Sequence, residues 1–127
     1  MADSPKEGKL LRTSISLSVN IVNLYDRIEK KSYLKNQLAR AATAIGANIH
    51  EATYAESGDD FIHKLRIALK ECHETEYWLN VLNACLPQLS EETHMLRKDA
   101  GAIRYMLISS INTRLNSLGK AQLYKKN

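Results

Sequence analysis

The stretch FIHKLRIALKECHETEYWLNVLNACL, residues 61–86, decides the fold of this chain. Its apolar and small residues recur at alternating steps of four and three, the pattern of a helix that packs in a bundle. This seam comprises Phe61, Leu65, Ala68, Cys72, Thr75, Leu79, Leu82 and Leu86. Ser57 or Asp59 can cap the free N–H groups at the start, and Pro87 ends the pattern. We therefore predict a helix over residues 59–85.

Three further segments show the same periodicity. We expect helices over residues 9–29, 32–55 and 90–118, with polar, flexible tails at residues 1–8 and 119–127. Ser90 is the expected N-cap of the last helix. The connections are short, so consecutive helices must be antiparallel neighbours. The predicted fold is a single all-α domain, residues 1–127, arranged as an up-down-up-down four-helix bundle.

The composition agrees with an all-α protein outside the membrane. Aromatic residues make up only 6% of the chain, and there are two prolines and five glycines. No apolar run approaches the roughly 18 residues of a membrane span, and the first residues, MADSPKEGK, do not resemble a signal peptide. We therefore expect a cytoplasmic protein that does not contact a membrane.

The two cysteines are expected to be reduced and buried. Cys72 and Cys85 fall in one predicted helix. Their Cα atoms would lie about 20 Å apart at the rise of an α-helix, which is far beyond the reach of a disulfide.

Catalytic and metal-binding chemistry has little support in the sequence. A carboxylate-bridged metal site in a bundle needs Glu-x-x-His motifs, and only Glu91 and His94 have that spacing. They fall in the first turn of the last predicted helix, where the positive end of the helix dipole stabilises a glutamate and a histidine is exposed to solvent. Cys72 and His73 are neighbours on a helix and point about 100° apart, so they cannot form a thiolate pair. We predict neither an enzyme nor a resident metal or cofactor.

The segment RAATAIGANIHEA, residues 40–52, predicts a close contact between two helices. Gly46 costs about 1 kcal/mol relative to alanine inside a helix, and Asn48 lies on the apolar stripe, where an amide needs a partner. We interpret Gly46 and the alanines as the place where two helix backbones approach each other. Asn48 is then a polar anchor, paired with a carboxylate of the third helix or with a neighbouring subunit.

Charged residues flank the seams of the second and third predicted helices. Glu71 and Glu74 are three residues apart and can face Arg40 or Asn48. We predict a buried or subunit-interface polar network in which Arg40 and Asn48 satisfy these carboxylates, and a ligand pocket is the alternative. The residues of this network are Arg40, Gly46, Asn48, Glu51, Glu71 and Glu74.

The best indication of function is an uneven distribution of positive charge. The chain has 18 Lys and Arg against 14 Asp and Glu, a net charge of +4, yet from Arg97 onward seven cations face only Asp99. The predicted basic patch comprises Arg97, Lys98, Arg104 and Arg114 of the last helix with Lys120 of its tail, Lys64, Arg66 and Lys70 of the third helix, and Lys30, Lys31 and Lys35 near the first connection. A monomer would present it as an ordinary solvated surface, whereas repetition around a ring would favour phosphate binding.

LARAATAIGANIHEA, residues 38–52, and FIHKLRIALKECHETEYWLNVL, residues 61–82, resemble the signature of a known bacterial family. These are four-helix-bundle proteins related to the ribosomal-RNA intervening-sequence proteins, together with the accessory variability determinant of diversity-generating retroelements. The most specific positions are Arg40, Ile45, Gly46, Ala47, Asn48, Glu51, Phe61, Glu71, Glu74, Tyr77, Trp78 and Leu79. The resemblance implies a ring, typically a homopentamer. In the retroelement branch it implies binding to nucleic acid and to a reverse transcriptase.

We consider three functions, each of a different class. We expect a non-enzymatic, homo-oligomeric RNA-binding protein, which in the retroelement branch would be the accessory subunit of a reverse transcriptase. The alternatives are a ring that docks a partner protein without nucleic acid and, least expected, a metal-dependent enzyme. Tyr77 and Trp78 belong to the helical signature, so we expect no aromatic platform for unpaired bases, and recognition through backbone and shape.

Overall fold

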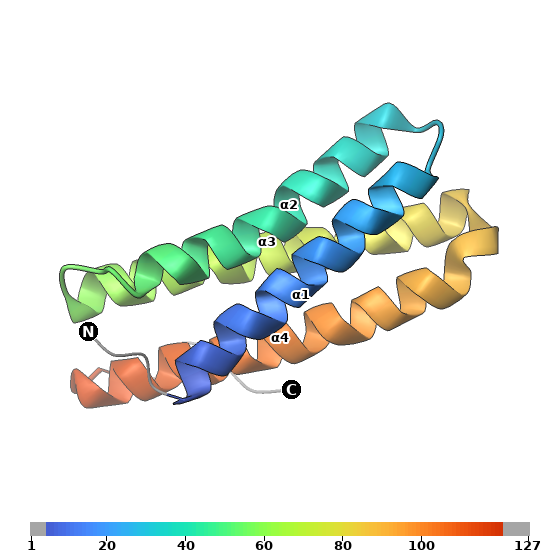
Figure 1. Cartoon of the computed structure of the whole chain (residues 1–127). Helices are drawn as coiled ribbons and strands as arrows, with labels where there is room; N and C mark the ends of the chain where they lie inside the picture. The colour runs from blue at the N-terminus through green and yellow to red at the C-terminus, as the bar shows by residue number, and fades with distance from the viewer. Residues whose placement is uncertain (1–4, 121–127) are drawn as a thin grey trace.

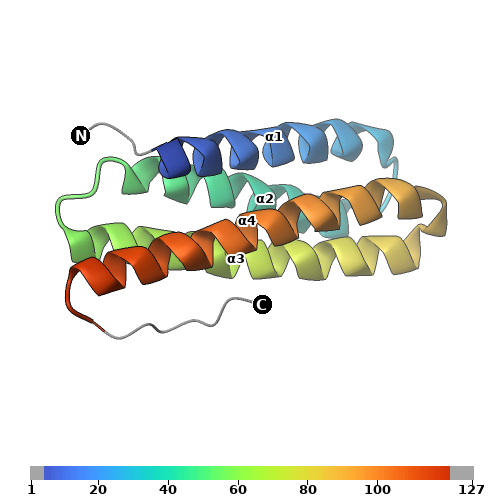
Figure 2. The same ribbon diagram turned by 90° about the horizontal axis from the view of Figure 1, so that it is seen from below.

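Four long helices form an antiparallel bundle in the computed structural model, which describes the backbone of residues 5–120 and the side chains of residues 8–120 (Figure 1). The helices are α1 (Pro5–Arg27), α2 (Ser32–Ala52), α3 (Gly58–Cys85) and α4 (Ser90–Ser117), and the short 3₁₀ turn η1 (Pro87–Leu89) precedes α4. Each helix packs beside its neighbours in the chain, and α4 closes the bundle against α1 (Figure 2). The predicted up-down-up-down fold is confirmed.

One apolar core runs through the bundle. The predicted seam of α3 faces it, since Phe61, Leu65, Ala68, Cys72, Thr75, Leu79 and Leu82 are buried and Leu86 is half-buried at the end. Leucines and isoleucines of α1, α2 and α4 supply the opposite walls of the core. The heptad pattern therefore identified the buried face correctly, because burial on a helix follows its local periodicity.

Some helix ends differ from the prediction. Residues 5–8 were expected in a flexible tail, but α1 begins at Pro5. Proline is favoured at a first helical position, where its missing N–H has no partner to lose. α1 ends at Arg27, two residues earlier than predicted. α2 ends at Ala52, and residues 53–55 turn through hydrogen bonds to carbonyls three residues back. Residues 1–4 and 121–127 of the predicted tails lie outside the described part of the chain.

The two predicted caps have different outcomes. Ser57 caps α3, because its Oγ accepts a hydrogen bond from the Asp60 N–H at 3.1 Å. Ser90 is not the N-cap of α4, and that prediction is wrong. Pro87 starts the η1 turn, so the chain is already helical at Ser90, and Leu89 occupies the capping position without a side-chain hydrogen bond.

The two cysteines also differ. Both are free thiols, and Cys72 is fully buried as predicted. Burial raises the pKa of the Cys72 thiol to about 12. Cys85 is exposed, which corrects the expectation that it is buried, because it lies in the last turn of α3 beside the seam residue Leu86.

α1 and α2 approach each other closely at Gly46, as predicted. A Cβ atom on Gly46 would lie 3.2 Å from Ser14 Oγ and 3.7 Å from Ser14 Cβ. One turn along the same contact, the Ser18 hydroxyl donates to the carbonyl of Ala42 at 3.4 Å. The small side chains within residues 40–52 therefore allow α1 to pack closely against α2.

None of the helices in the described part of the chain has both the length and the apolar character that a membrane crossing requires.

Candidate nucleic-acid interface

Four of the predicted cations, Arg97, Arg104 and Arg114 of α4 and Lys120 just after it, lie along the seam between α3 and α4, here called the α3/α4 seam. Arg97 Nη1 donates a hydrogen bond to Asn80 Oδ1 at 2.9 Å. Two turns further along α4, Arg104 Nε donates to Glu76 Oε1 at 3.0 Å. Both guanidinium groups are therefore held over the junction of the two helices.

The row continues to the other end of the same seam. The guanidinium carbon of Arg114 lies 4.1 Å from the centroid of the Phe61 ring, within the range of a cation–π contact. Lys120 Nζ lies 2.7 Å from Asp59 Oδ1. The contacts of these four cations thus run the length of α3, and two carboxylates face them.

The remaining predicted cations are dispersed. Lys64 lies 3.8 Å from Glu51 on the side of α3 that faces α2. Arg66 is half-buried on α3, whereas Lys70 and Lys98 are exposed. The structure therefore brings Arg97, Arg104, Arg114 and Lys120 together against α3 but does not join all the predicted cations in one patch.

A separate basic group lies at the end of the bundle. Lys30 and Lys31 are exposed, and with Arg27 they line a cavity of about 350 Å³ between the α1–α2 connection and the η1 turn. Lys35 folds back on the connection, where Nζ donates to the Ile28 carbonyl at 2.6 Å and lies 4.5 Å from the centroid of Tyr25. Lys30 and Lys31 therefore stay accessible to an anion.

The predicted contact between Arg40 and the α3 carboxylates is present within one chain. Arg40 Nη1 donates to Glu71 Oε2 at 3.0 Å, and Nη2 donates to Glu74 Oε1. The hydrogen bond from Arg40 is the largest cause of the lowered pKa of Glu74, and the bond to Glu74 likewise raises the pKa of Arg40. Glu71 is buried, and Arg40 supplies the opposite charge beside it.

Asn48 does not join that network. Its Nδ2 donates to the Ala44 carbonyl of its own helix at 2.8 Å, so the predicted pairing with an α3 carboxylate within the chain is wrong. A short amide reaches the carbonyl one turn back, and this bond satisfies its donor. Glu51 lies near Lys64, apart from Glu71 and Glu74.

An aromatic cluster, which the sequence analysis did not expect, lies on the outer side of α2 and α3. The ring centroids of Tyr33 and Trp78 are 5.9 Å apart, and those of Tyr77 and Trp78 are 5.0 Å apart. Tyr33 and Trp78 are 45 residues apart in the chain, so no local pattern brings them together. Their contact follows from the register of α2 against α3.

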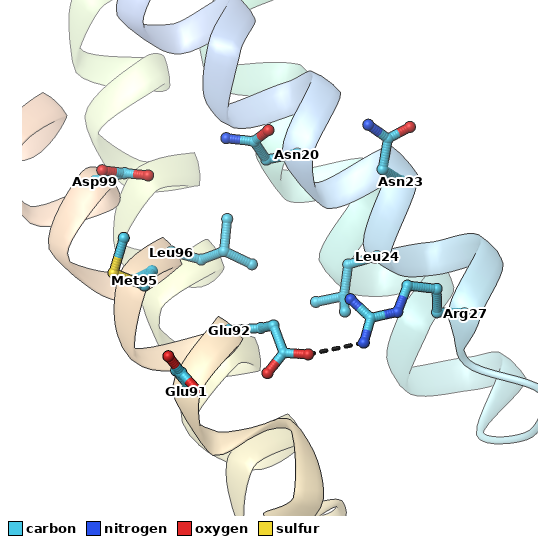
Figure 3. Close-up of a pocket in the computed structure, with 9 residues that line it drawn as sticks. All are labelled: Asn20, Asn23, Leu24, Arg27, Glu91, Glu92, Met95, Leu96 and Asp99. Carbon is cyan, nitrogen blue, oxygen red and sulfur yellow. Dashed lines mark hydrogen bonds and ion pairs between the residues drawn. The ribbon is translucent and has the colours of Figure 1, made fainter.

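One opening lies between α1 and α4. In Figure 1, α1 is inclined to α4, and the two helices separate toward the C-terminal end of α1. The cavity of about 460 Å³ at that end is lined by Asn20, Asn23, Leu24, Arg27, Glu91, Glu92, Met95, Leu96 and Asp99 (Figure 3). Arg27 spans it to reach Glu92 at 2.8 Å. This ion pair divides the opening and leaves it a mixed polar and apolar groove.

The histidines stand apart from any cluster of ligands. His50, His63, His73 and His94 are all exposed. Among the described side chains, those of residues 8–120, no three His, Cys, Asp or Glu are gathered in a way that could hold a metal ion.

The protein is thus a small antiparallel four-helix bundle. A row of cations lies along its α3/α4 seam, and polar and aromatic side chains lie along the neighbouring junction of α2 and α3. Residues 6–109 match the family described as 23S rRNA-intervening sequence protein, and the chain belongs to this family. The resemblance of residues 38–52 and 61–82 to the ribosomal-RNA intervening-sequence proteins is thereby confirmed.

A solved structure agrees with this assignment. The chain is similar to a protein of unknown function from the S23 ribosomal protein family of Bacteroides thetaiotaomicron. The two are 40% identical, with a TM-score of 0.79 over 84% of this chain and 98% of the other. No curated protein matches the sequence.

Proposed function

We propose that this chain is a non-catalytic RNA-binding accessory protein that works as a homo-oligomeric ring, typically a pentamer. The observation that carries the proposal is the α3/α4 seam, where four cations are held in a row against two carboxylates. Such a row contacts phosphates along a nucleic-acid backbone without reading bases. The family description, which refers to ribosomal RNA, supports RNA as the ligand. In a retroelement setting, the bound partner would be a reverse transcriptase.

Oligomerisation would multiply this weak basic surface. A ring of five chains, each with a net charge of +4, carries about +20. The exposed residues Ile15, Val19 and Val22 form an apolar stripe on α1, here called the α1 stripe, with exposed fractions of 51%, 50% and 45%. A second copy of the chain would cover this stripe.

The test is binding of a labelled RNA hairpin, followed by fluorescence anisotropy between about 50 and 200 mM salt. We expect an affinity that falls steeply with salt, because counterions are released from the phosphates. The double variant Arg97→Gln, Arg104→Gln should weaken binding to hairpins of unrelated sequence by a similar factor. Circular dichroism should show that the variant remains helical.

The matched control is the double variant Lys9→Gln, Arg12→Gln, which removes the same charge from exposed positions of α1. It should bind nearly as tightly as the parent chain. Absence of binding at the lower salt would refute the proposal, and equal weakening by both double variants would show that net charge acts without the α3/α4 seam.

A ring that docks a protein without nucleic acid is the second candidate, and the α1 stripe favours it, because exposed aliphatic surface suits a protein partner. Co-purification of a partner in the absence of RNA, lost in Val19→Asp, would favour this function over the first.

A further inference from the structure

We propose that Tyr33, Tyr77 and Trp78 form a stacking platform for unpaired nucleobases, here called the aromatic platform. The inference rests on the proposed RNA binding and adds a second contact, to bases, beside the phosphate contacts of the α3/α4 seam. Tyr33 is 71% exposed and Tyr77 58% exposed, and Trp78 is half-buried between them. The exposed rings of Tyr33 and Tyr77 are therefore accessible to a ligand.

The ring geometry leaves faces open. Tyr33 meets Trp78 at an interplanar angle of 75°, and Tyr77 meets it at 73°. In such edge-to-face pairs, the rings do not cover one another's faces as stacked rings would. A base can therefore lie on an exposed tyrosine face without displacing a protein contact.

Trp78, the central ring of the platform, is held in place before any ligand arrives. The Trp78 indole N–H donates to Glu74 Oε1 at 3.4 Å, and Arg40 holds the same carboxylate. Part of the Trp78 ring packs against the core. A ligand therefore need not order this side chain, which lowers the entropic cost of binding.

Cations flank the platform along α2 and α3. Lys31 is exposed two residues before Tyr33, and Lys70 is exposed on α3, close enough to contribute to the lowered pKa of Glu74. A strand laid along this junction would pass a cation, the rings and a second cation. Single-strand binding surfaces combine these two elements, since the cations follow the phosphates and the rings take the bases.

The surroundings favour a nucleic acid over an apolar protein face. The exposed aliphatic residues Ile15, Val19 and Val22 lie on α1, away from the platform. Beside the rings lie polar and charged side chains, Gln37 and Arg40 among them, and Arg40 Nε contacts the Gln37 amide oxygen. Unpaired bases fit better than a duplex, whose bases are already stacked on each other.

Trp78 supplies its own signal, because it is the only tryptophan of the chain. We expect its fluorescence to be quenched when the whole protein is titrated with an oligouridylate of about twelve nucleotides. Inorganic polyphosphate of similar length, which has the charge without the bases, should cause no quenching. An RNA duplex should bind without quenching.

Variants test the tyrosines. Tyr33→Ala and Tyr77→Ala should each weaken binding to the oligouridylate by about 5- to 100-fold, whereas Tyr33→Phe should keep it, because stacking needs the ring and not the hydroxyl. Tyr54→Ala is the matched control: Tyr54 is 76% exposed at the other end of α2 and contacts only His50 among the described ring pairs. It should leave binding unchanged.

The possible failures are distinguishable. Binding of oligouridylate without quenching, and with unchanged affinity in Tyr33→Ala, would overturn the aromatic platform and leave RNA binding standing. Absence of binding by any RNA, hairpin included, would overturn both proposals. A fall in the mass of the assembly with Tyr33→Ala, measured by light scattering, would assign the rings to a contact between subunits and would also overturn the platform.

Discussion

Gly46 shows how one missing side chain sets the distance between two helices. Ser14 faces it from α1 and is fully buried, and its hydroxyl donates to the Leu11 carbonyl at 2.7 Å. The position therefore has room for a hydrogen atom but little for a methyl group. The poor helix propensity of glycine, about 1 kcal/mol, is accepted in exchange for close packing.

We expect Gly46→Ala to lower the free energy of unfolding by about 1 kcal/mol, because overpacking costs more than the propensity gained. In the double variant Ser14→Ala, Gly46→Ala the nearest atom, Ser14 Oγ, is gone, so much of the loss should return. Urea unfolding of the parent, both single variants and the double variant gives the coupling. A Gly46→Ala chain more stable than its parent would contradict the close contact.

Arg40 gives the second prediction for single residues. The pKa of Glu74 is lowered in the folded chain, chiefly by the hydrogen bond from Arg40. Such a group stabilises the fold above its unfolded pKa, and the contribution is lost as the pH falls through the folded value. Arg40→Gln should cost about 1–2 kcal/mol at neutral pH, because the Glu74 pair is exposed but Glu71 is buried.

The difference between parent and Arg40→Gln should shrink as the pH is lowered below the ordinary glutamate range, about 4. Thermal or urea unfolding over a pH series measures it. Lys64→Gln is the control, with a smaller effect expected, because Lys64 lies 3.8 Å from Glu51 and that carboxylate is mostly exposed. A difference that stays constant with pH would show that Arg40 acts through packing alone.

For whole elements, the sequence predicts best what neighbouring residues decide. The buried face of α3 and the cap at Ser57 follow from residues within a few positions of each other. The helix was predicted to start at residue 90, as α4 does, but its N-cap was misassigned because residues 87–89 form an extra turn, which a search for capping residues does not detect. Arg40 was paired with Glu71 and Glu74 by their opposite charges, whereas the meeting of Tyr33 and Trp78 depends on helix register, which carries no local pattern.

Ser57, which caps α3, and Ser90, which does not cap α4, give a matched test of the cap assignments. Ser57→Ala should lower the free energy of unfolding by about 1 kcal/mol, because the Asp60 N–H loses the Ser57 hydroxyl that accepts its hydrogen bond. Ser57→Asp should keep most of that stability, because aspartate is also a good N-cap. Ser90→Ala should change stability by less than about 0.5 kcal/mol, since Ser90 is not a cap. Chemical denaturation of the three variants measures this, and equal losses at the two serines would refute the assignment of the caps.

In the whole molecule, the surfaces assigned to different roles lie on different sides. α1 and α3 are not adjacent within the described bundle, since each packs against α2 and α4. The α1 stripe can therefore be covered by another subunit while α3 keeps accessible its side of the α3/α4 seam and the platform residues Tyr77 and Trp78. A ring built through α1 and RNA binding through α3 are then compatible in one assembly.

The α1 stripe gives the last prediction. If it joins subunits, light scattering of the parent should give a mass well above the 14.4 kDa of one chain, about 72 kDa for a pentamer. Val19→Asp places a charge in the middle of the stripe and should shift the mass toward a monomer. Ser16→Asp introduces the same charge at an exposed position beside it, about 90° around the helix from the stripe, and should disturb the mass less. A parent chain of monomer mass at micromolar concentration would refute the ring, and a helical Val19→Asp variant of unchanged mass would place the subunit contact elsewhere.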